Sequence, residues 1–425
     1  MLVGILGGGL SGVSFQRFLK LKSEILEKEE RLGGLCRSFS KDGFLYDLGG
    51  HIIYSKEKQV IRLIRKILHD NINYCRRNNK ILFNGRLIKY PFENGVGELQ
   101  KEDIYECLMG YLSNKHVRME TFKDWIYKTF GDGISNKYLI PYNEKIWKFP
   151  LEKMGIEWVE RIPKPPTEDV IKSALGICTE GYTHQLYFNY PNSGGIENLV
   201  LSFMKNNAKV RTNFGVRKIL KVGNKWLVSN GSENKLYDKL VSTIPVKEIV
   251  KFLPSVPSNV LKAARGLRHN SVKIVHIGVN NNSLNDKSAI YIHDPNVLPH
   301  RVCYMKYFSS QNVPKDMSSL IAEISMRPGS NLFKTSDSVI IEDTISGLQR
   351  VGILRKRDIV TTDVKTIDYA YIVYDVYYKK NIDTIRNYLR SVGIELLGRF
   401  GEFEYINMDE VLKRSIKLAN KFNMV

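Results

Sequence analysis

The chain opens on an apolar strand pattern that runs directly into a glycine-rich turn. Met1–Leu6 is followed by Gly7, Gly9 and Gly12 in the spacing G-x-G-x-x-G, at the start of an apolar-periodic helix. The first two glycines permit a tight turn and close approach of backbone to a pyrophosphate, and the third permits close packing of helix on strand. A second strand ends at Glu27, placed to accept hydrogen bonds from a ribose. This βαβ unit predicts an α/β fold with a Rossmann-type, dinucleotide-binding domain.

Composition indicates a globular chain with a large core. It has 425 residues, of which 43% are hydrophobic, a length typical of two or three domains. No leader pattern is evident and no apolar run approaches the ~18 residues of a membrane-spanning helix, so we expect a soluble cytoplasmic protein rather than a membrane protein. Its 5 cysteines are widely spaced without a C-x-x-C pair. We therefore expect neither disulfides nor a metal site.

The chain is basic, with 64 Lys+Arg against 44 Asp+Glu and a net charge of +20. The excess is spread along the sequence instead of clustering with aromatic residues, and no nucleic-acid-binding motif is present. We expect mostly general surface charge, a few arginines inside the site, and no nucleic-acid partner.

The sequence downstream of Glu27 indicates FAD, rather than NAD, as the cofactor. A second Gly-Gly pair at Gly33–Gly34 is followed by Arg37 and Ser38, and then by Asp47-Leu48-Gly49-Gly50-His51. This pattern resembles the glutathione-reductase-like FAD enzymes, which include amine oxidases, protoporphyrinogen oxidases and UDP-galactopyranose mutases. The resemblance implies that Arg37 and Ser38 reach FAD and that the backbone of residues 49–51 lies beside the isoalloxazine. A buried core histidine remains the alternative for His51.

The same resemblance places a strand backbone at Val216 near the adenine, and Arg399 near the phosphates or ring of FAD. Asp409, at the start of the last helix, is either a cofactor contact or an N-cap. The expected FAD contacts are Gly7, Gly9, Leu10, Ser11, Gly12, Glu27, Lys28, Gly34, Arg37, Ser38, Gly49, Gly50, His51, Val216, Arg399, Asn407 and Met408.

The periodicity of the remaining chain predicts interleaved lobes. We expect an FAD-binding domain in two parts (1–94 and 167–270), a helical substrate lobe (95–166), a mixed or antiparallel substrate-domain sheet (271–365) and a C-terminal part returning to the FAD domain (366–425). Helices are predicted at Ile196–Lys205 and Met408–Asn420, and strands at Val216–Val222, Lys225–Val228, Lys239–Ile244, Val272–Val279, Ala289–His293, Val302–Phe308 and Ser319–Ser325.

Five separated segments resemble the UDP-galactopyranose mutase family, in order and over nearly the whole chain. They are Tyr90–Asn94 (YPFEN), Pro141–Trp147 (PYNEKIW), Trp158–Arg161 (WVER), Tyr291–Arg301 and Gly398–Asp409 (GRFG with Tyr405 and Asn407-Met408-Asp409). The resemblance implies that Arg161 and Arg301 clamp a sugar diphosphate, since guanidinium groups bind phosphate oxygens by charge-assisted hydrogen bonds. The expected catalytic residues are His51, Arg161 and Arg301, and further substrate contacts are Tyr138, Asn143, Trp147, Tyr291, Tyr371 and Tyr405.

The implied activity is FAD-dependent interconversion of pyranose and furanose forms of a UDP-sugar, with reduced flavin as nucleophile and an electron donor, NAD(P)H or a reductase, to reduce it. Cell-surface glycan biosynthesis is the implied pathway class, and a homo-oligomer is left open. Two departures, Ala370-Tyr371-Ile372 and the segment Tyr291–Pro295, leave the sugar open. The alternatives are a flavin-dependent oxidoreductase of the amine oxidase or protoporphyrinogen oxidase type, and a non-catalytic scaffold.

Overall fold

A five-stranded parallel sheet forms the centre of the dinucleotide-binding part. The computed structural model describes residues 1–159, 162, 164–181, 186–284 and 286–424. The strand order is β19-β13-β1-β2-β9, and each strand runs parallel to its neighbours. The strands are β1 (Leu2–Leu6), β2 (Lys22–Leu26), β9 (Lys209–Arg211), β13 (Lys239–Ser242) and β19 (Ile394–Leu396). The start, middle and end of the chain therefore build one sheet.

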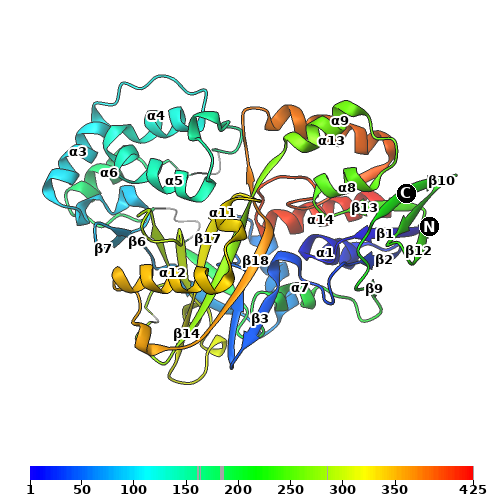
Figure 1. Cartoon of the computed structure of the whole chain (residues 1–425), viewed down its shortest axis with the longest axis horizontal. Helices are drawn as coiled ribbons and strands as arrows, with labels where there is room; N and C mark the ends of the chain where they lie inside the picture. Colours follow the sequence, from blue (N-terminus) through cyan, green and yellow to red (C-terminus); the bar gives the residue numbers. More distant parts are fainter. Residues whose placement is uncertain (160–161, 163, 182–185, 285, 425) are drawn as a thin grey trace.

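Helices from opposite ends of the chain pack together beside this sheet. α1 (Leu10–Phe18) follows β1 and contacts α14 (Met408–Asn423) near the C-terminus (Figure 1). The Ser14 hydroxyl donates to the Ser415 hydroxyl at 2.8 Å. The Phe15 and Phe422 rings meet edge to face, with centroids 5.5 Å apart. This contact brings the C-terminal residues next to the glycine-rich turn.

A seven-stranded sheet forms the second layer. Its order is β18-β14-β17-β16-β15-β6-β7, and all neighbours are antiparallel except the parallel pair β15 and β6. The strands are β6 (Asn79–Phe83), β7 (Arg86–Lys89), β14 (Arg268–Val279), β15 (Ala289–Ile292), β16 (Arg301–Tyr304), β17 (Ser318–Met326) and β18 (Ile359–Val373). Ile340 and Leu348 of α12 (Asp337–Arg350) pack with apolar residues of this sheet in a separate core.

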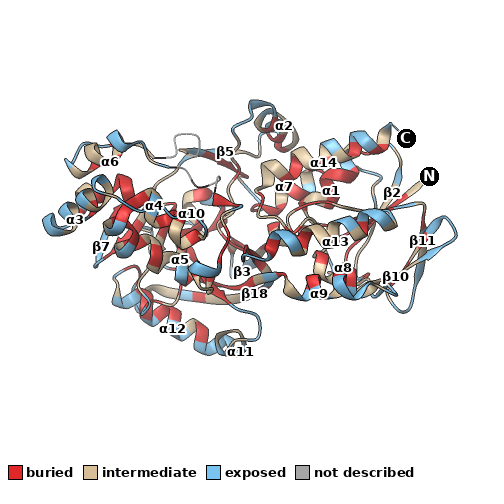
Figure 2. Ribbon diagram, turned by 90° about the horizontal axis from the view of Figure 1, so that it is seen from above, coloured by how far each residue is buried: buried red, intermediate tan, exposed pale blue. Residues whose placement is uncertain are grey.

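A helical lobe covers one end of the molecule. It contains α3 (Lys101–Leu112), α4 (Phe122–Ile134), a π-helical segment (Ser135–Leu139), α5 (Ile140–Trp147) and α6 (Thr167–Ala174) (Figure 1). Thr121 begins α4 with a reciprocal capping box to Asp124. Figure 2 shows buried residues in the helices of both the lobe and the dinucleotide-binding part, whereas α3 and α12 each carry many exposed residues.

Shorter elements complete the fold. A three-stranded meander consists of β10 (Lys218–Val222), β11 (Lys225–Ser229) and β12 (Asn234–Tyr237). Two small antiparallel pairs are β3 (Ser38–Lys41) with β4 (Phe44–Asp47), and β5 (Asn73–Arg76) with β8 (Tyr187–Tyr190). The remaining helices are α2 (Lys58–Leu68), α7 (Glu197–Ser202), α8 (Val246–Phe252), α9 (Ser258–Gly266), α10 (Met305–Phe308), α11 (Asn331–Lys334) and α13 (Tyr378–Val392).

The expected fold class is confirmed, while several element bounds differ from the sequence predictions. The strand predicted at Val302–Phe308 ends at Tyr304, and the helical turn α10 follows it, because a short apolar run satisfies either periodicity. The helix predicted at Ile196–Lys205 is the shorter α7. Strands β6 and β7, within the expected segment 1–94, pair in the seven-stranded sheet, and the expected boundary at 365/366 falls inside β18.

Across the part of the chain that the structure describes, every helix is too short or too polar to cross a lipid bilayer.

Asn270 joins the lobe to the seven-stranded sheet. Its buried side-chain amide donates to the carbonyls of Ile146 and Trp147, and Ser325 also donates to the Ile146 carbonyl. These carbonyls belong to the last turn of α5, where no backbone N–H of the helix is available to donate to them.

We predict that Asn270→Ala lowers the free energy of unfolding by about 1–3 kcal/mol, because it removes the side-chain donor to the buried Trp147 carbonyl, whereas the Ile146 carbonyl keeps Ser325. Chemical denaturation of the FAD-loaded protein measures this. Asn234→Ala, at an exposed position of β12, is the control and should leave the stability unchanged. Equal stability of Asn270→Ala and wild type would contradict the assigned role.

Candidate functional site

A cavity of about 1430 Å³ is walled by residues of both large sheets. Gly7, Glu27 and Thr243 contribute from the carboxyl ends of β1, β2 and β13. Arg301 and Glu323 contribute from β16 and β17 of the seven-stranded sheet. The carboxyl edge of an open parallel sheet is where dinucleotides bind in such folds.

The glycine-rich turn leaves room for a phosphate chain at the start of α1. Gly7 has a φ of +99°, which favours glycine. A Cβ on Gly12 would lie 2.1 Å from the Gly7 carbonyl oxygen, so the third glycine permits the helix–strand contact. Gly9 faces Gly34, and both line the cavity. Gly12 itself does not line the cavity, whereas Leu10 and Ser11 do.

Glu27 closes the next part of the cavity wall. Its carboxylate accepts from the Gly8 amide at 2.7 Å and from the Glu29 amide at 3.0 Å. Lys28 and Val216 line the same region, and the Lys28 side chain is 72% exposed. The two amides hold the Glu27 carboxylate in place at the cavity wall, and the sequence analysis expects this carboxylate to bind the ribose.

Arg37 and Ser38 separate in the structure, although they are neighbours in sequence. Arg37 lines the cavity and donates through Nε to the Gly34 carbonyl at 3.2 Å. Ser38 begins β3 with its side chain turned inward, where the hydroxyl donates to Asp47 at 2.6 Å and accepts from the Glu197 amide at 3.1 Å. Ser38 does not line the cavity, because its hydroxyl is used to join β3, β4 and α7.

The turn at Gly49–His51 forms the inner wall. Gly49 has a φ of +123°, and the Gly50 amide donates to Glu323 at 2.9 Å. Burial lowers the pKa of His51 to about 4, and the Arg399 and Arg301 cations lower it further against the opposing effect of Glu323. His51 is therefore neutral at pH 7.

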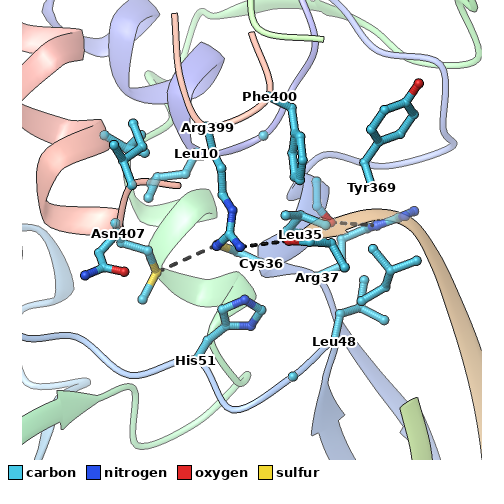
Figure 3. A pocket seen from close by; sticks show the side chains of 18 of the residues that line it. Leu10, Leu35, Cys36, Arg37, Leu48, His51, Tyr369, Arg399, Phe400 and Asn407 are labelled. Atoms are coloured by element: carbon cyan, nitrogen blue, oxygen red, sulfur yellow. Dashed lines mark hydrogen bonds between the residues drawn. The ribbon is translucent and has the colours of Figure 1, made fainter. Parts of the chain in front are cut away.

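Arg399 reaches into this inner region from the C-terminal part of the chain. Its Nη2 donates to the Ala370 carbonyl at 2.7 Å, and its guanidinium lies 3.9 Å from the centre of the Tyr405 ring. Figure 3 shows the guanidinium extending toward His51. Asn407 lines the cavity and donates to the Tyr54 hydroxyl at 2.8 Å.

Residues at the start of α14 complete this wall. Met408 accepts a weak bond from the Cys36 thiol at 3.8 Å. The N-cap of the helix is Asn407, so the alternative of Asp409 as the N-cap is wrong; Asp409 lies in the first turn and lines the cavity.

Two observations fit an FAD molecule in this cavity. The closely approaching Gly9 and Gly34 leave a side-chain-free passage beside the N-terminus of α1, suited to a pyrophosphate. Among the described residues, the buried His51 Nδ1 and Arg399 Nε have no hydrogen-bond partner. Buried polar atoms are normally satisfied, and a bound ligand is one source of partners.

Four expected substrate contacts meet in one region of the cavity, namely Tyr291, Arg301, Tyr371 and Tyr405. The Tyr291 ring stacks on Tyr90 with centroids 4.5 Å apart. Tyr371 lies 6.0 Å from Tyr405, ring centre to ring centre. The structure thus brings these four residues together with His51.

Three expected contacts in the helical lobe do not line the cavity. Tyr138 is buried and stacks on Phe92 at 4.9 Å. Asn143 donates to the Leu139 carbonyl at 2.7 Å and accepts from the Trp147 indole at 3.1 Å. Their polar and aromatic groups are used for packing within the lobe. Arg161 lies outside the described residues.

Glu323 was missed by the sequence analysis. It is 1% exposed and sits in the centre of β17, where its carboxylate accepts from Gly50, from Arg301 at 2.7 Å and from Tyr371 at 3.3 Å. Burial acts to raise its pKa, but the Arg301 guanidinium and these donors leave the pKa below its usual value. A lone glutamate inside the apolar run Ser318–Met326 was the available signal.

Two family models match the chain. The model of NAD(P)-binding Rossmann-like domains matches residues 5–67, which contain the glycine-rich turn. The model of flavin containing amine oxidoreductases matches residues 149–389, more than half of the chain. The chain belongs to the flavin-containing amine oxidoreductase family. Its cofactor is FAD, as expected from the sequence.

Solved structures of this family's fold cover the chain almost completely. A reduced UDP-galactopyranose mutase is 25% identical, with a TM-score of 0.90 over 98% of this chain and 94% of that one. A protein of Exiguobacterium sp. 255-15 assigned as a protoporphyrinogen oxidase is 16% identical, with a TM-score of 0.78 over 100% and 98%. A fatty acid isomerase from P. acnes is 13% identical, with a TM-score of 0.68 over 99% and 98%. The last two show the fold alone.

We predict different outcomes for alanine at two glycines of the turn. A methyl group on Gly9 meets nothing closer than Gly34 Cα at 3.7 Å, but it enters the passage for the pyrophosphate. Gly9→Ala should fold normally and bind FAD about tenfold more weakly or worse, a loss of at least about 1.4 kcal/mol. Gly12→Ala should also lower the unfolding temperature of the apoprotein, because its methyl group collides with the Gly7 carbonyl. FAD titration of the apoprotein and thermal unfolding measure the two effects; wild-type FAD affinity in Gly9→Ala would contradict the placement.

Proposed function

We propose that this protein is an FAD-dependent nucleotide-sugar mutase that interconverts the pyranose and furanose forms of a UDP-sugar, of the UDP-galactopyranose and UDP-galactofuranose type. The observation that carries the proposal is the shared cavity: Arg301, Tyr291 and Tyr371 open on the same space as the Gly49–His51 turn. The likeness to a solved UDP-galactopyranose mutase over nearly the whole chain supports it.

Arg301 has the geometry of a phosphate ligand. Its Nη2 is held by the Glu323 carboxylate at 2.7 Å, while its buried Nε has no partner among the described residues. A guanidinium anchored through one nitrogen keeps N–H groups for a second anion, and its planar fork matches phosphate oxygens. The anchor also fixes the orientation of the guanidinium, so less conformational entropy is lost when a diphosphate binds.

Bound FAD in its reduced form supplies the nucleophile for the anomeric carbon of the sugar in this proposal. The chain's own residues hold and orient the substrate. Arg301 donates hydrogen bonds to the departing diphosphate. Tyr291 offers a hydroxyl group beside it, and Tyr371, whose hydroxyl donates to Glu323 at 3.3 Å, lines the same cavity. His51 is neutral and presents a ring nitrogen rather than a charge to the reacting centre.

The helical lobe, residues 95–166, is proposed to receive the nucleotide end of the substrate. Trp147 of the lobe packs edge-on against Tyr371, with centroids 6.2 Å apart, and therefore reaches the cavity wall indirectly. Arg161 is proposed as a second diphosphate ligand. Tyr138 and Asn143 would act through the packing of the lobe.

The proposal implies further features that follow from the chemistry. An electron donor, NAD(P)H or a reductase, must reduce the flavin before turnover. We also propose, from the UDP-sugar substrate, a cytoplasmic location and a role in cell-surface glycan biosynthesis.

The second candidate is a flavin-dependent oxidoreductase of the amine oxidase or protoporphyrinogen oxidase type. The family match favours it, because the matching model is that of amine oxidoreductases. Such an enzyme does not require a buried arginine for a diphosphate.

Turnover under two redox conditions distinguishes these candidates. We expect dithionite-reduced protein to interconvert UDP-galactopyranose and UDP-galactofuranose, as measured by anion-exchange chromatography, and the oxidised protein to be inactive. Hydrogen peroxide produced from an amine or a porphyrinogen, together with no sugar interconversion, would favour the oxidoreductase.

Arg301→Ala should keep FAD and weaken UDP binding by about 2–5 kcal/mol, the usual loss when one partner of a desolvated charge pair is removed. Arg118→Ala is the matched control: Arg118 is 66% exposed and pairs with Glu120 on the surface of the lobe. Isothermal titration of reduced protein with UDP measures both. Wild-type affinity in Arg301→Ala would refute the assigned role.

A further inference from the structure

A buried ion pair lies against the inner wall of the FAD cavity. The Glu323 side chain is 2% exposed and the Arg301 side chain is 24% exposed, and Nη2 of the arginine lies 2.7 Å from both carboxylate oxygens. The carboxylate also accepts from the Gly50 amide at 2.9 Å. One acid of the seven-stranded sheet thus binds the Gly49–His51 turn and an arginine of the neighbouring strand.

Burial shifts the pKa values of four other groups beside the pair, His300, Cys303, Tyr371 and His51, toward their neutral forms. Burial lowers the pKa of His300 to about 3, although its Nε2 is 3.6 Å from Glu323. Burial raises the pKa of the Cys303 thiol to about 12 and raises that of Tyr371 well above its usual value. His51 is neutral as well. The charged side chains that act on His51 at this wall are Glu323, Arg399 and Arg301.

The position of this pair relative to FAD follows from the shape of the cavity. The passage between Gly9 and Gly34 takes the pyrophosphate, and Glu27 lies on the ribose and adenine side of it. The flavin half of the molecule must extend the other way. The Gly49–His51 turn and the Arg301–Glu323 pair are part of the remaining cavity wall.

We propose that Glu323 sets the reduction potential of the bound FAD by cancelling the charge of Arg301. A reduced flavin carries more negative charge than an oxidised one, so an uncompensated cation beside it favours reduction. In a low-dielectric site such a charge acts strongly, and nearby charges are a recognised means of tuning flavin electronics. Glu323 keeps Arg301 in place for an anionic ligand without making the flavin permanently easier to reduce. The inference rests on FAD binding and holds for either candidate function.

The test measures the midpoint potential of bound FAD in three variants. Glu323→Gln preserves the size of the side chain and an acceptor for Gly50, but it leaves Arg301 unbalanced. We expect the ratio of reduced to oxidised flavin at fixed potential to rise at least about tenfold, a positive shift of about 30 mV for a two-electron couple. The double variant Glu323→Gln/Arg301→Gln restores neutrality and should return the potential close to wild type.

Glu248→Gln is the matched control. Glu248 of α8 also lines the cavity, but its carboxylate accepts from Tyr369 and Lys251 and does not contact Arg301. Its removal should leave the potential unchanged, because the cation that it leaves unbalanced, Lys251, is 62% exposed and its charge is screened by solvent.

An unchanged or lowered potential in Glu323→Gln would overturn the inference, as would a double variant that keeps the raised potential. Should Glu323→Gln fail to retain FAD, the double variant decides. FAD binding there at a near wild-type potential supports charge cancellation. Loss of FAD from the double variant as well means that the hydrogen bonds of the carboxylate, rather than its charge, are what matter, and it contradicts the inference.

Discussion

The hydrogen bond from the Gly50 amide to the Glu323 carboxylate joins the two halves of the site. Gly50 belongs to the dinucleotide-binding part, and Glu323 belongs to the seven-stranded sheet. The same carboxylate holds Arg301 and accepts from Tyr371. A turn of the dinucleotide-binding part and two side chains of the seven-stranded sheet, all of which line the cavity, are thereby positioned by one buried group, whose desolvation is offset by the donors around it.

This arrangement explains how a family fold can serve a particular chemistry. The parallel sheet and the glycine-rich turn supply a dinucleotide site that many flavoenzymes share, so they do not determine the reaction. Specificity depends on what the second sheet presents to the cofactor. Here that surface consists of an anchored arginine among tyrosines, a combination suited to holding an anionic substrate beside an aromatic ring system.

Local constraints made the cofactor half predictable from the sequence. The spacing of Gly7, Gly9 and Gly12 reports a turn whose requirements lie within a few residues, and the acid after the next strand completes it. Ser38 shows the limit of this reasoning, because the direction of its side chain depends on pairing with Asp47 and Glu197. α10 shows another, since a run of four residues can form a strand or a helical turn with equal local preference.

Long-range contacts account for most of what the sequence could not show. The partners of Glu323 lie 22, 48 and 273 residues away in the chain, and no local pattern encodes those distances. The lobe residues Asn143 and Trp147 carried a family motif, yet their side chains hydrogen-bond to each other and to the Leu139 carbonyl within the lobe.

A crystal structure of the dithionite-reduced protein with UDP tests the account most directly. We predict that the flavin ring lies against the Gly50 backbone and that a UDP phosphate oxygen lies within hydrogen-bonding distance of the Arg301 guanidinium. A UDP molecule bound away from Arg301, or a flavin ring at another wall of the cavity, would contradict it.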